Sequence, residues 1–176
     1  KEEKSFKQIA AGLRTSKVFI LADEMGAGKT STMENFTQEL KKKYPSHWIS
    51  YVNLENVKSK FNKPIDPIKL TIADEILNLT SFDAKFFDES YENRRVILIL
   101  DNVEELSNTQ RANFMQMTKD LKDQSKNTQI IAVDRVNSRR LEGNLGVISH
   151  EFVPFNKSQR AEFIRKQMKG NSRGKR

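Results

Sequence analysis

The chain has 176 residues, of which 36% are hydrophobic, so it can bury one well-packed core but is short for two ordinary domains. It has no cysteine and only two distant histidines, which excludes disulfides, thiolate metal sites and histidine pairs with metal-ligand spacing. No apolar run approaches the ~20 residues of a membrane span, and the first residues do not resemble a secretory signal. We therefore expect a cytoplasmic or otherwise intracellular chain without membrane contact.

The net charge of +8 lies in the last quarter of the sequence. Residues 135–176 contain 11 Lys/Arg and 3 Asp/Glu, and 11 − 3 = +8, whereas residues 1–134 contain 20 of each sign. This favours an exposed terminal helix within one domain at residues 1–170, followed by a disordered basic tail at 171–176. A nucleic-acid-binding surface is the alternative that the charge leaves open.

Five short segments with strand character alternate with helical patterns along the chain. This alternation predicts an α/β fold in which a mainly parallel sheet lies between two layers of helices. The third segment is apolar throughout, as a strand buried on both faces should be, whereas the second and fifth contain polar residues and should be peripheral. The segments are KVFILA (17–22), HWISYVNL (47–54), RVILILD (95–101), QIIAV (129–133) and VISHEFV (147–153).

Helix boundaries are marked by capping and stop signals. The helix after the first strand should end at the basic run Lys41–Lys43, before Pro45. An N-cap signal at residue 66 should open a helix with one apolar face, formed by Ile68, Ile72, Ile76 and Leu79. The helix after residue 107 should bury Phe114, Met117 and Leu121. The starting signals are Asp66 before Pro67, Ser107 with Gln110, and Asn156 with Gln159.

The stretch LADEMGAGKTSTM has the composition of a phosphate-binding loop between a strand and a helix. A triphosphate needs backbone N–H groups at a helix N-terminus, a lysine for the β and γ phosphates, and a hydroxyl for magnesium. Lys29 and Thr30 supply the last two. The usual pattern GxxxxGK(S/T) has glycine where Asp23 stands, and repulsion from phosphate predicts that Asp23 and Glu24 point away. The predicted nucleotide-binding residues are Gly26, Ala27, Gly28, Lys29, Thr30 and Ser31.

The segment VILILDNVEEL adds carboxylates at the end of a neighbouring strand. Asp101 is the predicted magnesium ligand together with Thr30, and either Glu104 or Glu105 can orient the attacking water, with Glu104 favoured. A polar strand end and solvated turn residues are the alternatives. The segment QIIAVDR places Arg135 near the same sheet edge, where a guanidinium can contact the γ-phosphate. The predicted catalytic set is Lys29, Glu104, Glu105 and Arg135.

These segments resemble the NACHT group of signal-transducing (STAND) P-loop ATPases over nearly the whole chain. ADEMGAGKT is similar to the family's phosphate loop, KKYPSHWISYVNL to its second strand, VILILDNVEEL to its acidic strand and FVPFNKSQRAEFI to its fifth strand and following helix. IIAVDR stands where the family often has Thr-Thr-Arg or Thr-Ser-Arg. The resemblance implies a three-layer P-loop NTPase sandwich with a five-stranded sheet in the order 2-3-4-1-5. It also implies ATP/ADP and Mg²⁺ as cofactors, and a nucleotide-dependent conformational switch.

The resemblance further implies helical and winged-helix domains C-terminal to residue 176, and a homo-oligomer in the full protein. Slow ATP hydrolysis by a switch is the favoured function. One alternative is a helicase-like ATPase lobe stimulated by nucleic acid, since ADEMGAGKT also resembles the first motif of such motors. Another is an interaction module that binds nucleotide without hydrolysis, because Glu104 stands where the family commonly has aspartate.

Overall fold

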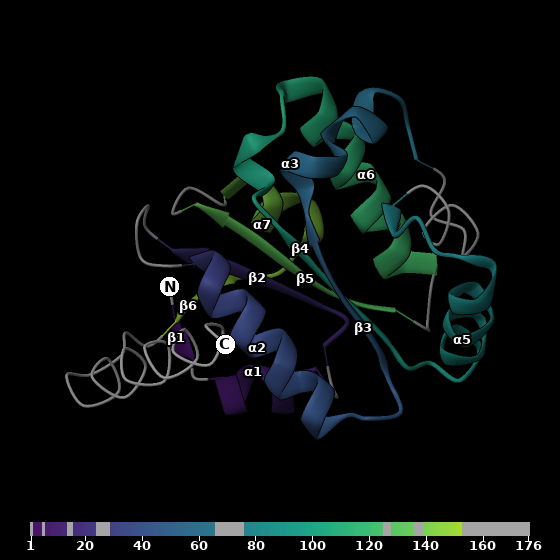
Figure 1. Cartoon of the computed structure of the whole chain (residues 1–176). Coiled ribbons are helices and arrows are strands. Elements are labelled where there is room, and N and C mark those ends of the chain that lie inside the picture. Colours follow the sequence, from purple (N-terminus) through teal and green to yellow (C-terminus); the bar gives the residue numbers. More distant parts are fainter. Residues whose placement is uncertain are drawn as a thin grey trace, which may run out of the picture.

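A computed structural model of the chain describes residues 2–4, 6–13, 16–23, 29–65, 76–124, 128–135 and 139–152 (Figure 1). Within these residues a six-stranded sheet runs through the middle of the molecule, with helices on both faces. The strands are β1 (Glu2–Lys4), β2 (Val18–Asp23), β3 (Trp48–Asn53), β4 (Val96–Asp101), β5 (Thr128–Arg135) and β6 (Ser149–Phe152).

The sheet is parallel throughout, and its strand order is β1-β6-β2-β5-β4-β3. Read from β3, the five predicted strands follow in the order 2-3-4-1-5, which confirms the predicted topology. The three-residue strand β1 was not predicted. Because β1 pairs with β6 along residues 2–4, the fifth predicted strand is not the outer strand that its polar residues indicated.

The helices divide into two layers. Helices α1 (Phe6–Gly12) and α2 (Lys29–Lys43) pack on one face of the sheet, and the remaining helices pack on the other (Figure 1). No helix of the described residues is long and apolar enough to cross a membrane. The second layer contains α3 (Leu54–Val57), α5 (Ser81–Glu92), α6 (Asn108–Gln124) and α7 (Arg139–Leu145), with the 3-10 turns η1 (Lys58–Asn62) and η3 (Val103–Glu105).

Strand β4 contributes to both hydrophobic cores because successive side chains of a strand point to opposite faces. Val96, Leu98 and Leu100 belong to the cluster shared with α3, α5, α6 and α7. Ile97 and Ile99 belong to the cluster shared with α1 and α2. All five are at most 1% exposed, and burial of each such side chain contributes about 1.5–3 kcal/mol. The strand is therefore fixed from both sides.

Several predicted helix boundaries are confirmed. Helix α2 ends at Lys43, two residues before Pro45. At the start of α6, the backbone N–H of Ser107 donates to Oε1 of Gln110 at 3.0 Å, and the N–H of Gln110 donates to the Ser107 hydroxyl at 3.4 Å. The reciprocal pair is the predicted capping box. The predicted apolar face of this helix is fully buried, at Phe114, Met117 and Leu121.

Other expectations are wrong or lie outside the described residues. Leu79 was expected on a helix, but it is not helical, because Asn78 adopts a left-handed φ of 50°. A separate helix, α5, then begins after Thr80, whose hydroxyl accepts from the N–H of Asp83 at 3.2 Å. The predicted helix starts at 66–67 and 156–159, and the tail 171–176, lie outside the described residues.

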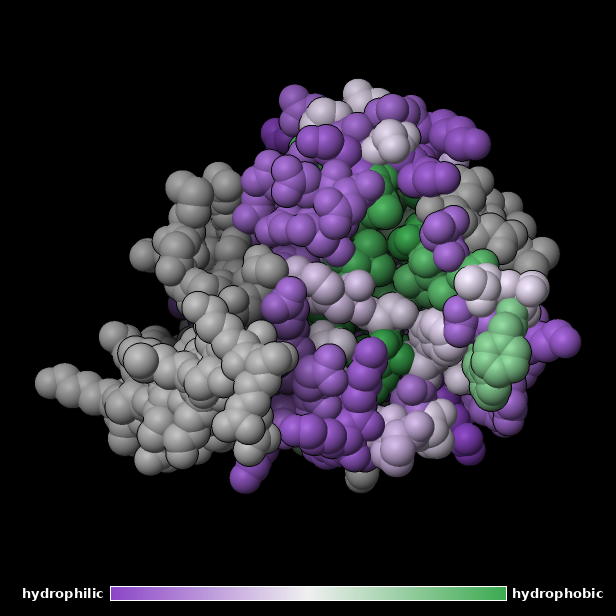
Figure 2. Space-filling model, viewed as in Figure 1, coloured by the Kyte–Doolittle hydropathy of each residue, from purple (hydrophilic) through white to green (hydrophobic). Residues whose placement is uncertain are grey.

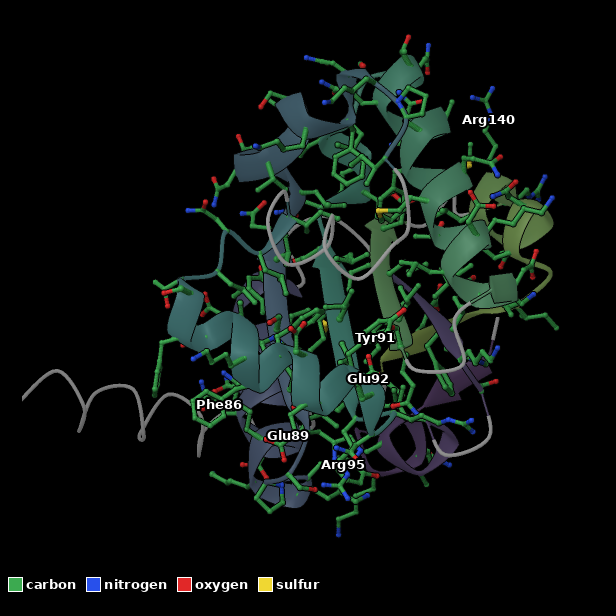
Figure 3. All side chains as sticks on the ribbon, turned by 90° about the vertical axis from the view of Figure 1, so that its right-hand side faces the viewer. Phe86, Glu89, Tyr91, Glu92, Arg95 and Arg140 are labelled. Atoms are coloured by element: carbon green, nitrogen blue, oxygen red, sulfur yellow. The ribbon has the colours of Figure 1, made fainter. Side chains whose placement is uncertain are left out.

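Helix α5 lies at the side of the molecule, and Figure 3 looks directly onto it. Phe87 is fully buried and packs edge-on against Trp48 of β3, with ring centroids 5.7 Å apart. Phe86 is 50% exposed, and Glu89 and Glu92 lie farther along the same helix (Figure 3). The helix therefore presents one buried aromatic to the core and a mixed aromatic and acidic surface to solvent.

Two glycines give a matched test of packing between α1 and the sheet. A Cβ added at Gly12 would lie 2.5 Å from Cζ of the buried Phe19, whereas a Cβ at Gly143 in α7 would meet nothing within 4 Å. We expect Gly12→Ala to lower the free energy of unfolding by about 1–3 kcal/mol through overpacking. Gly143→Ala should be neutral or raise it by up to ~1 kcal/mol. Urea unfolding measures both, and equal stability of the two variants would contradict this packing.

Candidate functional site

The carboxyl ends of neighbouring strands meet at one edge of the sheet. Asp23, the last residue of β2, is paired in register with Arg135, the last residue of β5. Asn53 and Asp101 end β3 and β4 and are likewise paired. Ligands of open parallel sheets bind at this edge. Four strand ends therefore converge where the sequence predicts the nucleotide.

Helix α2 begins at Lys29, so Lys29, Thr30 and Ser31 form its first turn. Five residues separate this turn from the end of β2, and they lie outside the described residues. The side-chain orientations predicted for Asp23 and Glu24 are likewise not described. The strand before the predicted loop and the helix after it are thus both present. The predicted residues in the gap are Gly26, Ala27 and Gly28.

Asp101 is a buried carboxylate on the α2 side of the sheet. It is 1% exposed, and it follows Ile97 and Ile99 at alternate positions of β4, so it shares their face. Its Oδ2 accepts a hydrogen bond of 2.7 Å from the hydroxyl of Tyr51, and its Oδ1 accepts one of 2.8 Å from the N–H of Asn102. These donors stabilise the charged form of a group that would otherwise be costly to bury.

Asn102 adopts a left-handed conformation, with φ 64° and ψ 44°. Asparagine tolerates this region better than most residues. Its Nδ2 donates to Oδ1 of Asn53 at 3.0 Å, and the same oxygen accepts from the N–H of Glu55 at the start of α3. The ends of β3 and β4 are thus joined by a polar network. Sequence reasoning did not assign a role to Tyr51, Asn53 or Asn102, although an asparagine directly after a strand is a signal for such a turn.

The two candidate water-orienting glutamates lie on η3, directly after Asn102. Val103 of this turn is fully buried, Glu104 is half-buried and Glu105 is exposed. Nη2 of Arg111 donates to the carbonyl of Val103 at 3.0 Å, which ties the turn to α6. The turn also lies beside β5, the strand that ends at Arg135. Glu104 is therefore the less exposed of the two glutamates.

The donor set suits magnesium bound together with a nucleotide. Among the described residues, no three histidine, aspartate or glutamate side chains form a cluster that could hold a metal ion by themselves. Magnesium commonly takes one or two carboxylates, with phosphate and water oxygens completing its coordination. The buried carboxylate of Asp101, on the face covered by α2, fits such an ion. When bound, magnesium would neutralise phosphate charge, and Asp101 with Thr30 would hold it.

A groove of about 1090 Å³ runs along the outer edge of β3, between α2 and residues 76–79. Figure 2 shows hydrophobic side chains gathered in a hollow on this face, with hydrophilic residues around them. Its lining includes Tyr51, Val52 and Ile76. His47 also lines the groove, and its pKa is lowered from the ordinary value, mainly by burial and to a lesser extent by the positive charge of Arg95. The groove follows β3 to its last residue, Asn53, so one end of it reaches the sheet edge where the phosphates are predicted.

No family model and no curated protein matches the chain. Solved structures match its fold. The Walker-type ATPase PABY2304 of Pyrococcus abyssi has a TM-score of 0.57 at 14% identity, with 98% of this chain and 61% of that chain covered. Cdc6p from Pyrobaculum aerophilum has a TM-score of 0.52 at 18% identity, with 92% and 46% covered. The replication initiator DnaA, bound to AMPPCP and single-stranded DNA, has a TM-score of 0.53 at 16% identity, with 94% and 49% covered.

These likenesses establish that the chain has the α/β fold of P-loop ATPases. Because the identities are 14–18%, they concern the fold alone. The chain spans between 46% and 61% of the length of these three proteins. The phosphate-loop motif predicts nucleotide binding, and the fold is one that Walker-type ATPases share.

Asn102 allows a test of the network at the strand ends. Asn102→Ala should lower the free energy of unfolding by about 1–2 kcal/mol, because it loses the bond to Asn53 and because alanine tolerates the left-handed region less well than asparagine. Asn102→Gly loses the same bond without that backbone strain and should be less destabilised. Urea unfolding compares the two variants. A glycine variant that is the less stable of the two would show that the backbone conformation is not limiting.

Proposed function

We propose that this chain is an ATP/ADP-binding domain of the NACHT/STAND type, which acts as a nucleotide-dependent conformational or assembly switch with slow, magnesium-dependent ATP hydrolysis. The observation that carries the proposal is the buried carboxylate of Asp101 on the sheet face covered by α2, the helix that begins at Lys29. A magnesium-nucleotide complex needs a carboxylate and a lysine-led helix at one sheet edge. The fold shared with Walker-type ATPases supports this reading.

Each proposed role follows from residue chemistry and position. Backbone N–H groups of residues 26–31 cradle the phosphates, and Lys29 neutralises the β and γ phosphates. Thr30 and Asp101 hold magnesium. Glu104, or else Glu105, orients the attacking water, and Arg135 contacts the γ-phosphate and reports its loss. The pairing of Arg135 with the end of β2, the strand before the cradle, supports the last role.

The output of such a switch is a change of conformation or assembly rather than a product. We propose that residues 1–170 form the nucleotide domain and residues 171–176 a basic tail. Helical and winged-helix domains on its C-terminal side, and further copies in a homo-oligomer, are the proposed partners that respond to the bound nucleotide. The proposed location is inside the cell, where ATP and magnesium are supplied.

A nucleic-acid-stimulated ATPase is the second candidate. Two observations favour it: the similar DnaA structure holds single-stranded DNA, and the chain's whole net charge of +8 lies in residues 135–176. The third candidate is a module that binds nucleotide but does not hydrolyse it. It is favoured by a single feature, a glutamate at position 104 where the resembled family commonly has aspartate.

Lys29→Ala tests the nucleotide site. Loss of a charge-assisted contact to phosphate should weaken ATP binding by roughly 30-fold or more in calorimetry with magnesium. Lys41→Ala is the matched control, because it removes the same charge from the exposed C-terminal turn of the same helix.

Phosphate release from ATP by the wild-type protein should be slow and should not change when single- or double-stranded nucleic acid is added. ATP binding unchanged by Lys29→Ala would disprove the phosphate site, and strong stimulation would favour the second candidate.

The choice between the glutamates is tested by conservative substitution. Glu104→Gln should preserve ATP affinity and slow phosphate release by roughly 100-fold or more, because the amide cannot accept a proton from water. Glu105→Gln, in the exposed position of the same turn, should have little effect. If only Glu105→Gln slows release, the assignment to Glu104 is wrong. If wild-type protein releases no phosphate but binds ATP through Lys29, the binding module is the better description.

A further inference from the structure

The hydroxyl of Tyr51 joins the edge strand of the sheet to the carboxylate proposed to hold magnesium. Tyr51 lies two residues before the end of β3, and its ring packs partly buried against the core on the α2 face. Its hydroxyl donates to Oδ2 of Asp101 at 2.7 Å, across 50 residues of sequence. The contact therefore exists only because β3 and β4 lie side by side.

Two donors hold the Asp101 carboxylate in different ways. The N–H of Asn102 belongs to the next residue, so its 2.8 Å bond to Oδ1 orients the side chain relative to its own backbone. Tyr51 comes from the neighbouring strand, so its bond to Oδ2 orients the carboxylate relative to the sheet. Because both oxygens accept a hydrogen bond, rotation of the carboxylate about its Cβ–Cγ bond breaks at least one hydrogen bond to a charged group.

We propose that Tyr51 is a positioning residue, which holds Asp101 in the orientation that takes part in binding the magnesium complex of the nucleotide. This inference rests on the proposed function, because it assigns Tyr51 a role toward the magnesium site of that function. Metal-binding side chains need hydrogen bonds that fix their orientation, because a small displacement of the side chain weakens its interaction with the metal ion. Tyr51 does not itself contact the ion or the phosphates; it acts through Asp101.

The alternative role for this hydrogen bond is structural, as one more link between β3 and β4. The chain contains a tyrosine that separates the two roles. The hydroxyl of Tyr44 also donates at 2.7 Å, to the carbonyl of Ala10, and its ring packs against the same core. Tyr44 follows the last residue of α2, about 21 Å along the helix from Lys29. Tyr44→Phe removes the same atom and a bond of the same length, far from the proposed site.

The test measures ATP affinity by calorimetry, once with magnesium and once with a chelator, and takes the ratio of the two. In Tyr51→Phe this magnesium-dependent gain should fall about fivefold, the effect of losing one hydrogen bond of ordinary strength. Affinity in chelator should be unchanged. Tyr44→Phe should keep the wild-type ratio. Urea unfolding of both variants confirms that each remains folded under the conditions of the titration.

Two reference variants distinguish failure of this inference from failure of the proposed function. If Lys29→Ala leaves ATP binding unchanged, or if the wild type gains no affinity from magnesium, the proposed function fails and the role of Tyr51 fails with it. If Asp101→Ala lowers the ratio but Tyr51→Phe does not, the magnesium site stands and the role of Tyr51 is overturned. An equal fall in Tyr44→Phe and Tyr51→Phe also overturns it, because the effect would then be general stability.

Discussion

The burial of β4 on both faces is the constraint on which the rest of the structure depends. A strand without a solvent-facing side needs helices on both sides of the sheet, and the alternation of its side chains assigns each one to a core. The same alternation carries Asp101 to the α2 side at the point where the strand ends. The position of the site is therefore a consequence of packing, because the register that buries Ile97 and Ile99 also orients the carboxylate that follows them.

Burying a carboxylate at this point requires donors, and the local structure is arranged around them. The left-handed turn at Asn102 directs its N–H to Oδ1 of Asp101 and its amide to Asn53, which also caps α3. Tyr51 supplies a further donor from β3. Glycine at position 102 would fit the turn but could not reach Asn53. Asparagine at this position therefore both tolerates the left-handed turn and supplies the side-chain hydrogen bond to Asn53.

The predictable features were those that depend on local chemistry. Alternation of apolar strands with helices predicts the parallel sheet, and Ser107 with Gln110 predicts the start of α6, because a capping box satisfies its own hydrogen bonds. The strand order came from the family resemblance, not from periodicity. Helix α5 was missed although Thr80 and Asp83 have cap spacing, because the apolar positions from Ile68 to Leu79 suggested one longer helix. Strand β1 was missed because EEK has no strand pattern of its own and forms only by pairing with β6.

Contacts between distant segments explain what the sequence left open at the site. Asp101 was predicted from five apolar residues followed by an acid, a signal contained within one strand. Nothing near Tyr51 in sequence indicates that its hydroxyl meets Asp101, because the contact depends on the register between β3 and β4. The same applies to Arg111, whose bond to the carbonyl of Val103 becomes visible only when α6 packs against the turn. Positioning residues are defined by tertiary contacts, whereas the groups they position are often defined by motifs.

The charges at the strand ends explain why nucleotide and magnesium binding should be coupled. Asp101 and Asp134 lie within the last two residues of the neighbouring strands β4 and β5, and both are at most 4% exposed. A triphosphate brought to this edge adds negative charge near carboxylates in a medium of low dielectric constant, where repulsion is stronger than in water. The proposed contacts of Lys29 and Arg135 offset only part of that charge. A divalent cation lowers this repulsion, and the phosphates in turn supply ligands to the cation. By linkage, the cation and the nucleotide each strengthen binding of the other.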